Sequence, residues 1–278
     1  MTRTRVIAAL ILAPVAVAAI LLLPTPWMVA LAALVFLVGL WEWFRLADID
    51  DTLARTALLV VNMALMVAIV WGSRTSSGFS YVLLQLMTVL GVIWWLLAML
   101  WLKHFDFGSD HAGYARAYKL AAGTLAIVPA WCALGVLHGG DPNGHRWLLV
   151  ALASVWAADT GAYFAGRRYG KRKLAPRISP NKTVEGAIGG LAAALLAALV
   201  LAPFAGASLG QLALVAVVTL FAAAFSVVGD LFESLLKRHV GAKDSGDLIP
   251  GHGGILDRID GVVAALPVFA LGKAWLGF

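Results

Sequence analysis

Acidic side chains are concentrated in one polar segment near the C-terminal end of the 278-residue sequence. Residues 230 to 260 include six carboxylates, with four lysines and arginines among them. If a helix continues through the start of this segment, Asp230, Glu233 and Lys237 share one face, because residues three and four apart are neighbours on a helix. Asp257 and Asp260 have the same spacing. Carboxylates from two helices suit Mg²⁺, which also takes water and phosphate oxygens.

A glycine-rich loop, residues 250–254, lies between these two groups of acids. Gly253 and Gly254 would let backbone amides approach a phosphate, just before a helix N-terminus that favours anions. The alternative is a tight turn in which the acids cap the helix and pair with Arg258. His252 is either a hydrogen-bond donor to phosphate or a turn residue. A phosphate monoester is already mostly dianionic at neutral pH, so it needs no general base.

A second polar group, Ser179, Lys182 and Thr183, comes immediately before another apolar run. Hydroxyls and a lysine at a helix start can hold phosphate oxygens together with free backbone amides. The alternative is that Thr183 only caps the helix. A P-loop is excluded because its glycines and its preceding strand are missing.

Asp159 lies within a predicted membrane span. A carboxylate in a span is costly, and by default it indicates a functional site that faces the interior of the bundle. Asp159 is one to two helical turns from the basic segment that follows this span. We therefore expect it to reach the same cleft as the other acids.

These polar groups are set in a very apolar chain, with 62% hydrophobic and 13% charged residues. That balance leaves too little polar surface to cover a water-soluble globule. About 20 apolar residues are needed to cross a bilayer as a helix. The sequence predicts an all-α, polytopic bundle of about nine spans, at residues 6–23, 27–45, 53–72, 81–102, 117–138, 146–166, 184–206, 209–232 and 255–276.

The basic residues predict the orientation of this bundle, because cytoplasmic loops are enriched in lysine and arginine. With the N-terminus inside and the C-terminus outside, 18 of the 21 basic residues are cytoplasmic, and the exceptions are Arg74, Arg146 and Lys273. Topology accounts for most of the +6 net charge, so nucleic-acid binding is not needed. The dense cluster from 167 to 182 would also attract anionic lipids or nucleotides.

We expect a single membrane domain over 1–278, with residues 1–140 mainly as scaffold and residues 146–278 as the catalytic part. Polar residues within the scaffold, such as Glu42, are assigned no function, because they more often mark an interfacial belt or a helix contact. Cys132 is alone and cannot form an intramolecular disulfide.

The C-terminal part resembles the phosphatidate cytidylyltransferase (CDP-diacylglycerol synthase) family. The resemblance rests on a long gapped pattern, Ser234-x-x-Lys237-Arg238 followed by Lys243-Asp244-x-Gly246-x-x-Ile249-Pro250-Gly251-His252-Gly253-Gly254-x-x-Asp257-Arg258-x-Asp260. It is supported by the stretches from Ala158 to Tyr163 and from Ser179 to Thr183. The resemblance implies transfer of a cytidylyl group from CTP to phosphatidic acid, with release of pyrophosphate.

The resemblance also implies roles for the acids and bases. It implies that Asp230, Asp257 and Asp260, with Asp159, hold Mg²⁺ and leave room for a second cation. CTP or the lipid phosphate would be bound by the basic residues and their neighbours, namely Lys182, Lys237, Arg238, Lys243 and Arg258 with Ser179, Thr183, His252, Gly253 and Gly254. The expected setting is the bacterial inner membrane, with the site facing the cytoplasm and membrane lipids around it. The oligomeric state is open, a homodimer included.

Two other functions compete with this interpretation. An ion-coupled transporter also gathers carboxylates and glycine breaks, but its site lies near the membrane midplane between repeated halves. Here the charges cluster at one face, without an evident repeat. A CTP-dependent lipid kinase would use the same cleft and differ in its product.

Overall fold

The computed structural model describes residues 13–76, 78–246 and 253–278. In these ranges eight helices are long and apolar enough to cross a membrane. They are α2 (Thr25–Leu46), α3 (Thr52–Gly72), α4 (Val82–Lys103), α5 (Gly113–Gly139), α6 (Gly144–Tyr169), α7 (Val184–Leu201), α8 (Leu212–His239, preceded by the 3-10 turn Leu209–Gln211) and α9 (Leu256–Leu276). The predicted helical bundle is confirmed, although α8 runs seven residues past its predicted end. The first predicted span lies partly outside the described residues, and Ala13–Leu22 is helical.

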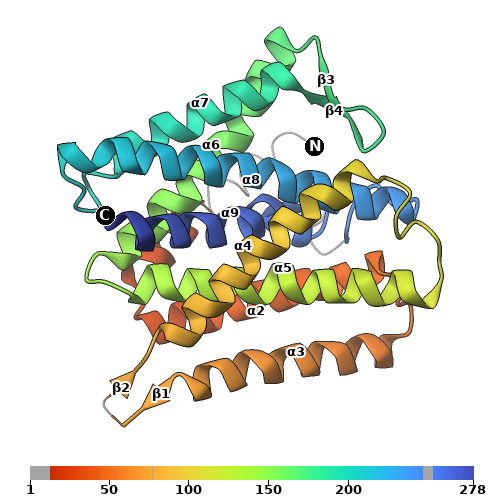
Figure 1. The fold of residues 1–278 in the computed structure, drawn as a ribbon, viewed down its shortest axis with the longest axis horizontal. Helices are drawn as coiled ribbons and strands as arrows, with labels where there is room; N and C mark the ends of the chain where they lie inside the picture. Colours follow the sequence, from red (N-terminus) through yellow and green to blue (C-terminus); the bar gives the residue numbers. More distant parts are fainter. Residues whose placement is uncertain (1–12, 77, 247–252) are drawn as a thin grey trace.

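Successive spans run in opposite directions, so their connections gather at two ends of the bundle (Figure 1). One end carries a hairpin of β1 (Arg74–Thr75) and β2 (Gly78–Phe79), and the other carries a hairpin of β3 (Lys173–Ala175) and β4 (Ser179–Thr183). Both hairpins are antiparallel, and Lys173 pairs with Thr183 in the second. Arg74, Arg146 and Lys273 lie at the β1–β2 end, as the charge count predicts. Which end is cytoplasmic stays a prediction.

An aromatic cluster fixes α8 against the first half of the bundle. Phe232 is fully buried, and its ring lies 5.4 to 6.0 Å from the rings of four tryptophans on α2 and α4, namely Trp43, Trp94, Trp95 and Trp101. Such aromatic pairs add stability beyond the area that they bury. The next residue along α8 is Glu233, so this packing sets the position of the polar face of the helix.

Small residues bring α6 and α7 into close contact. A Cβ atom added to Gly190 would lie 2.7 Å from the carbonyl oxygen of Ala158, and one added to Gly186 would lie 3.0 Å from that of Ala162. Small residues let the backbones of two membrane helices approach closely. These two glycines therefore serve helix packing, and the close contact places Asp159 of α6 beside the first turns of α7.

Replacing Gly190 by alanine should separate these two helices. We expect Gly190→Ala to lower the free energy of unfolding by about 1 to 3 kcal/mol, because the new methyl group meets a backbone oxygen that cannot move away freely. Gly210→Ala is the matched control, since an added Cβ there has nothing within 4 Å. Thermal unfolding in detergent measures both variants. Equal melting temperatures would contradict the close contact.

Candidate active site

The polar face of α8 is present as the sequence predicts. The helix continues to His239, which places Asp230, Glu233, Ser234 and Lys237 along one side. The Ser234 hydroxyl donates to Asp230 Oδ1 at 3.4 Å, and Lys237 forms an ion pair with Glu233. The Lys237 side chain is only 11% exposed. This lysine is therefore a buried positive charge between acids and is not open to the solvent.

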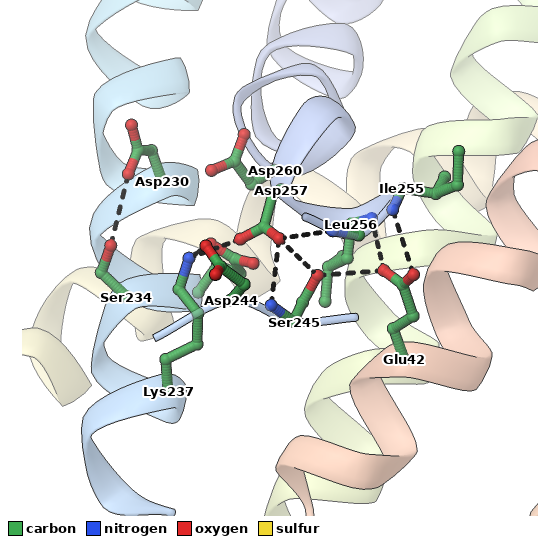
Figure 2. A network of polar contacts seen from close by, with 12 residues as sticks. Glu42, Asp230, Ser234, Lys237, Asp244, Ser245, Ile255, Leu256, Asp257 and Asp260 are labelled. Atoms are coloured by element: carbon green, nitrogen blue, oxygen red, sulfur yellow. Dashed lines mark hydrogen bonds and ion pairs between the residues drawn. The ribbon is translucent and has the colours of Figure 1, made fainter. Parts of the chain in front are cut away.

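Asp257, in the first turn of α9, is the second acid that contacts Lys237. Its Oδ1 accepts a hydrogen bond from Lys237 Nζ at 2.7 Å. Its Oδ2 accepts bonds from the amide of Ser245 at 3.0 Å, the hydroxyl of Ser245 at 2.9 Å and the amide of Gly254 at 2.8 Å. Figure 2 shows this carboxylate at the centre of the network, between α8 and the loop that precedes α9. Both oxygens of Asp257 thus have protein partners.

Glu42 of α2 is a member of this network that sequence reasoning missed. It is 6% exposed, and it accepts hydrogen bonds from the amides of Ile255 at 3.1 Å and Leu256 at 2.8 Å. Its neighbours in sequence are tryptophans, which suggested an interfacial belt. The cost of placing a carboxylate in an apolar span, the signal that identified Asp159, applies to Glu42 as well.

The start of α9 therefore differs from the phosphate site that its glycines suggested. The amides of Gly254, Ile255 and Leu256 already donate to Asp257 or Glu42. Protein carboxylates thus supply the anion that a helix N-terminus favours. The capping alternative, in which the acids satisfy the helix start, describes this arrangement better.

A second group of acids lies beside the first. Asp159, Asp230 and Asp260 come from α6, α8 and α9, and they lie close enough to influence one another electrostatically. In Figure 2 the carboxylates of Asp230 and Asp260 lie on the same side of Asp257. Lys182 of β4 forms an ion pair with Asp230, and the charge of Arg258 acts on Asp159. Three carboxyl groups thus lie near two basic side chains.

A divalent cation fits the chemistry of this second group, although the described part of the chain assembles no group of three ligands. Among the described residues, no three His, Cys, Asp or Glu side chains are placed to hold one metal ion. Magnesium, however, usually takes one or two protein carboxylates and completes its shell with water and substrate phosphates. Asp230 and Asp260 meet that need, since among the described residues Asp260 accepts a hydrogen bond only from the Gly261 amide. Asp257 fits less well, because Lys237 already neutralises it.

The remaining predicted residues surround these two groups. Arg238 donates to the carbonyl of Ile178 at 3.2 Å, which ties the β3–β4 hairpin to α8, and Ser179 lies next to that contact, partly buried. Thr183 caps α7 by accepting from the Gly186 amide at 3.1 Å, so its capping role is confirmed. Lys243 and Arg258 are exposed. Gly253 adopts a positive φ of 81° beside Asp257. His252 lies outside the described residues.

The fold and this site define an integral membrane protein. Its acids and bases come together in the parts of α2, α6, α8 and α9 that lie nearest the β3–β4 hairpin. Comparison with known proteins gives the family. A model of the cytidylyltransferase family matches residues 3–274. The chain belongs to the cytidylyltransferase family.

Curated relatives are similar to this chain in sequence, two of them over nearly their whole length. The phosphatidate cytidylyltransferase of Pseudomonas aeruginosa is 40% identical over 270 residues, which cover 97% of this chain and 96% of the relative. The phosphatidate cytidylyltransferase of Haemophilus influenzae is 38% identical, with 97% and 98% covered. The enzyme of the same name from Bacillus subtilis is 47% identical over 127 residues, covering 46% of this chain and 47% of the relative. The resemblance found in the sequence is confirmed.

The two lysines of the site should differ in their effect on stability. Lys237→Ala leaves two buried carboxylates without their shared cation, and we expect a loss of about 3 to 5 kcal/mol in the free energy of unfolding. Lys182 and Asp230 are 26% and 31% exposed. Lys182→Ala should therefore cost only about 0 to 1 kcal/mol. Thermal unfolding of the two purified variants compares them, and equal losses would contradict the structural role of Lys237.

Proposed function

We propose that this chain is a phosphatidate cytidylyltransferase, which makes CDP-diacylglycerol and pyrophosphate from CTP and phosphatidic acid. The observation that carries the proposal is the family match along almost the whole chain, together with relatives of that name at 38% and 40% identity. The site supports it independently. Acids suited to a cation lie beside basic side chains suited to phosphates, in the half of the bundle nearest the β3–β4 hairpin.

The chemistry requires little beyond positioning and charge neutralisation. An oxygen of the phosphatidic acid phosphate attacks the α-phosphorus of CTP. The bond from that phosphorus to the oxygen that bridges the α- and β-phosphates breaks, and this oxygen leaves with pyrophosphate. Mg²⁺ bound by Asp230 and Asp260, with Asp159 nearby, would neutralise charge on the phosphates. Lys182 and Arg258 lie near these acids. They are suited to hold the phosphates of CTP or of the lipid.

The location of the site also follows from the substrates. CTP arrives from the cytoplasm, while the acyl chains of phosphatidic acid stay in the bilayer. A site at the β3–β4 end of the bundle serves both if that end is cytoplasmic, and the basic residues gathered there favour this orientation. For a bacterial enzyme the corresponding membrane is the inner membrane, because its inner face is in contact with the cytoplasm that supplies CTP.

The product identifies the reaction directly. Purified protein incubated with Mg²⁺, CTP and phosphatidic acid should release pyrophosphate and form CDP-diacylglycerol in equal amounts. Mass spectrometry of the lipid extract and an enzymatic assay for pyrophosphate measure the two products. Formation of CDP together with a newly phosphorylated lipid would instead identify a CTP-dependent lipid kinase and overturn the proposal.

Asp260 offers a test of the proposed cation site. Asp260→Asn should lower kcat at least about 100-fold, because the amide keeps the shape of the carboxylate but loses the charge that would hold Mg²⁺. Asp141→Asn is the matched control. Asp141 accepts a hydrogen bond from Lys273 at 2.7 Å, and it lies at the opposite end of the bundle, away from the proposed cation site. Near-normal turnover of the Asp260 variant across a Mg²⁺ titration would reject the role.

A further inference from the structure

Glu42 makes contacts that a scaffold residue does not need. It lies on α2, more than 200 residues before the segment that it contacts, and its side chain is buried. Besides the two amides at the start of α9, its Oε2 lies 3.0 Å from the Ser245 hydroxyl. The carboxylate thus contacts both sides of the loop that joins α8 to α9, as Figure 2 shows.

These contacts replace a cap that α9 lacks. The residue before the helix, Ile255, makes no capping hydrogen bond with its side chain. The first amides of a helix have no partner within the helix, and the helix dipole makes this end favourable for a negative charge. Glu42 accepts from two of these amides, and Asp257 accepts from the preceding one at Gly254. The direction in which α9 begins therefore depends on a side chain of α2.

Ser245 joins Glu42 to the acids of the site. Its hydroxyl lies 3.0 Å from Glu42 Oε2 and 2.9 Å from Asp257 Oδ2, and Asp257 in turn contacts Lys237. A continuous series of polar contacts thus runs from α2 to α8. The backbone around it leaves no spare room, because a Cβ atom on Gly246 or Gly254 would collide with the Glu42 carboxylate.

We propose that Glu42 is a positioning residue for the reaction. By holding the first amides of α9 and the hydroxyl of Ser245, it fixes the direction in which α9 begins. It thereby keeps Asp257 beside Lys237 and Asp260 near Asp230. Glu42 itself touches no substrate in this proposal. The inference rests on the proposed function, because it names the residue that keeps the side chains of the proposed cation and phosphate site in position.

A purely structural role for Glu42 would make different predictions. If the carboxylate only stabilised the fold, its loss would reduce the amount of folded protein, and the folded molecules would keep normal turnover. A positioning role lowers kcat in molecules that are fully folded. It also makes Glu42 and Ser245 act as one unit, since both hold the same part of the loop.

The test compares Glu42→Gln with a helix-cap variant elsewhere in the scaffold. Glutamine keeps the size and one carbonyl oxygen, but its amide group cannot accept from the second backbone amide. Asp51→Asn is the matched control, because Asp51 also accepts from two amides at a helix start, those of Leu53 and Ala54 on α3. We expect Glu42→Gln to lower kcat about 10- to 100-fold at an unchanged yield of folded protein, and Asp51→Asn to keep the wild-type kcat.

Two further measurements do not depend on yield. Hydrogen exchange of the amides at 255 and 256 should accelerate in Glu42→Gln but not in Asp51→Asn. In a double-mutant cycle with Ser245→Ala, the loss in kcat of the double variant should be smaller than the product of the two single losses, because each change breaks the same link.

The proposal is overturned if Glu42→Gln turns over normally, if Asp51→Asn loses as much kcat, or if the losses with Ser245→Ala simply multiply. A kcat loss that is matched by an equal loss of folded protein also overturns it. Failure of the proposed function is recognised separately, because wild-type protein would then form no CDP-diacylglycerol. Exchange at 255 and 256 would still report whether Glu42 holds the start of α9.

Discussion

The arrangement of the site depends on the contacts of the Asp257 carboxylate. A charged group within a mostly apolar bundle must be paired and hydrogen-bonded, because burying it alone is very costly. Asp257 meets this requirement with partners from three parts of the chain, Lys237 on α8, Ser245 in the loop and the amide of Gly254. Each partner is thereby held in place. The same carboxylate ties the start of α9 to α8 and, through Ser245, to α2.

The membrane explains why so much polar chemistry is confined to one end of the helices. Within hydrocarbon, backbone groups must be satisfied inside each helix, so the spans are long, apolar and nearly uniform. Charged side chains are tolerated only where a helix ends near water or where opposite charges pair with one another. Phe232 and its four tryptophans pack next to Glu233. The acids and lysines of the site lie in the half of the helices nearest the β3–β4 hairpin. A reaction between a soluble nucleotide and a lipid headgroup requires such a boundary.

The sequence predicts the parts of this structure that follow from local periodicity. Hydropathy locates the spans, and the spacing of Asp230, Glu233 and Lys237 predicts one face of α8, because both depend on neighbours a few residues apart. Local patterns do not reveal the contact between Glu42 and the start of α9, which joins distant segments. The short strands of the β3–β4 hairpin carry too few alternating residues to be recognised. The burial of Lys237 between two acids likewise depends on how α8 and α9 pack.

The two groups of charges differ in how freely they can change partners. The ion pairs of Lys237 with Glu233 and Asp257 are buried, so breaking either one leaves a buried charge without its partner. The pair of Lys182 and Asp230 is partly exposed, and such pairs contribute little to stability. Moving the Lys182 side chain from Asp230 to a phosphate would therefore cost little free energy. Moving Lys237 away from its two acids would instead disrupt the fold. Burial thus separates the charges that maintain the site from those proposed to bind a substrate.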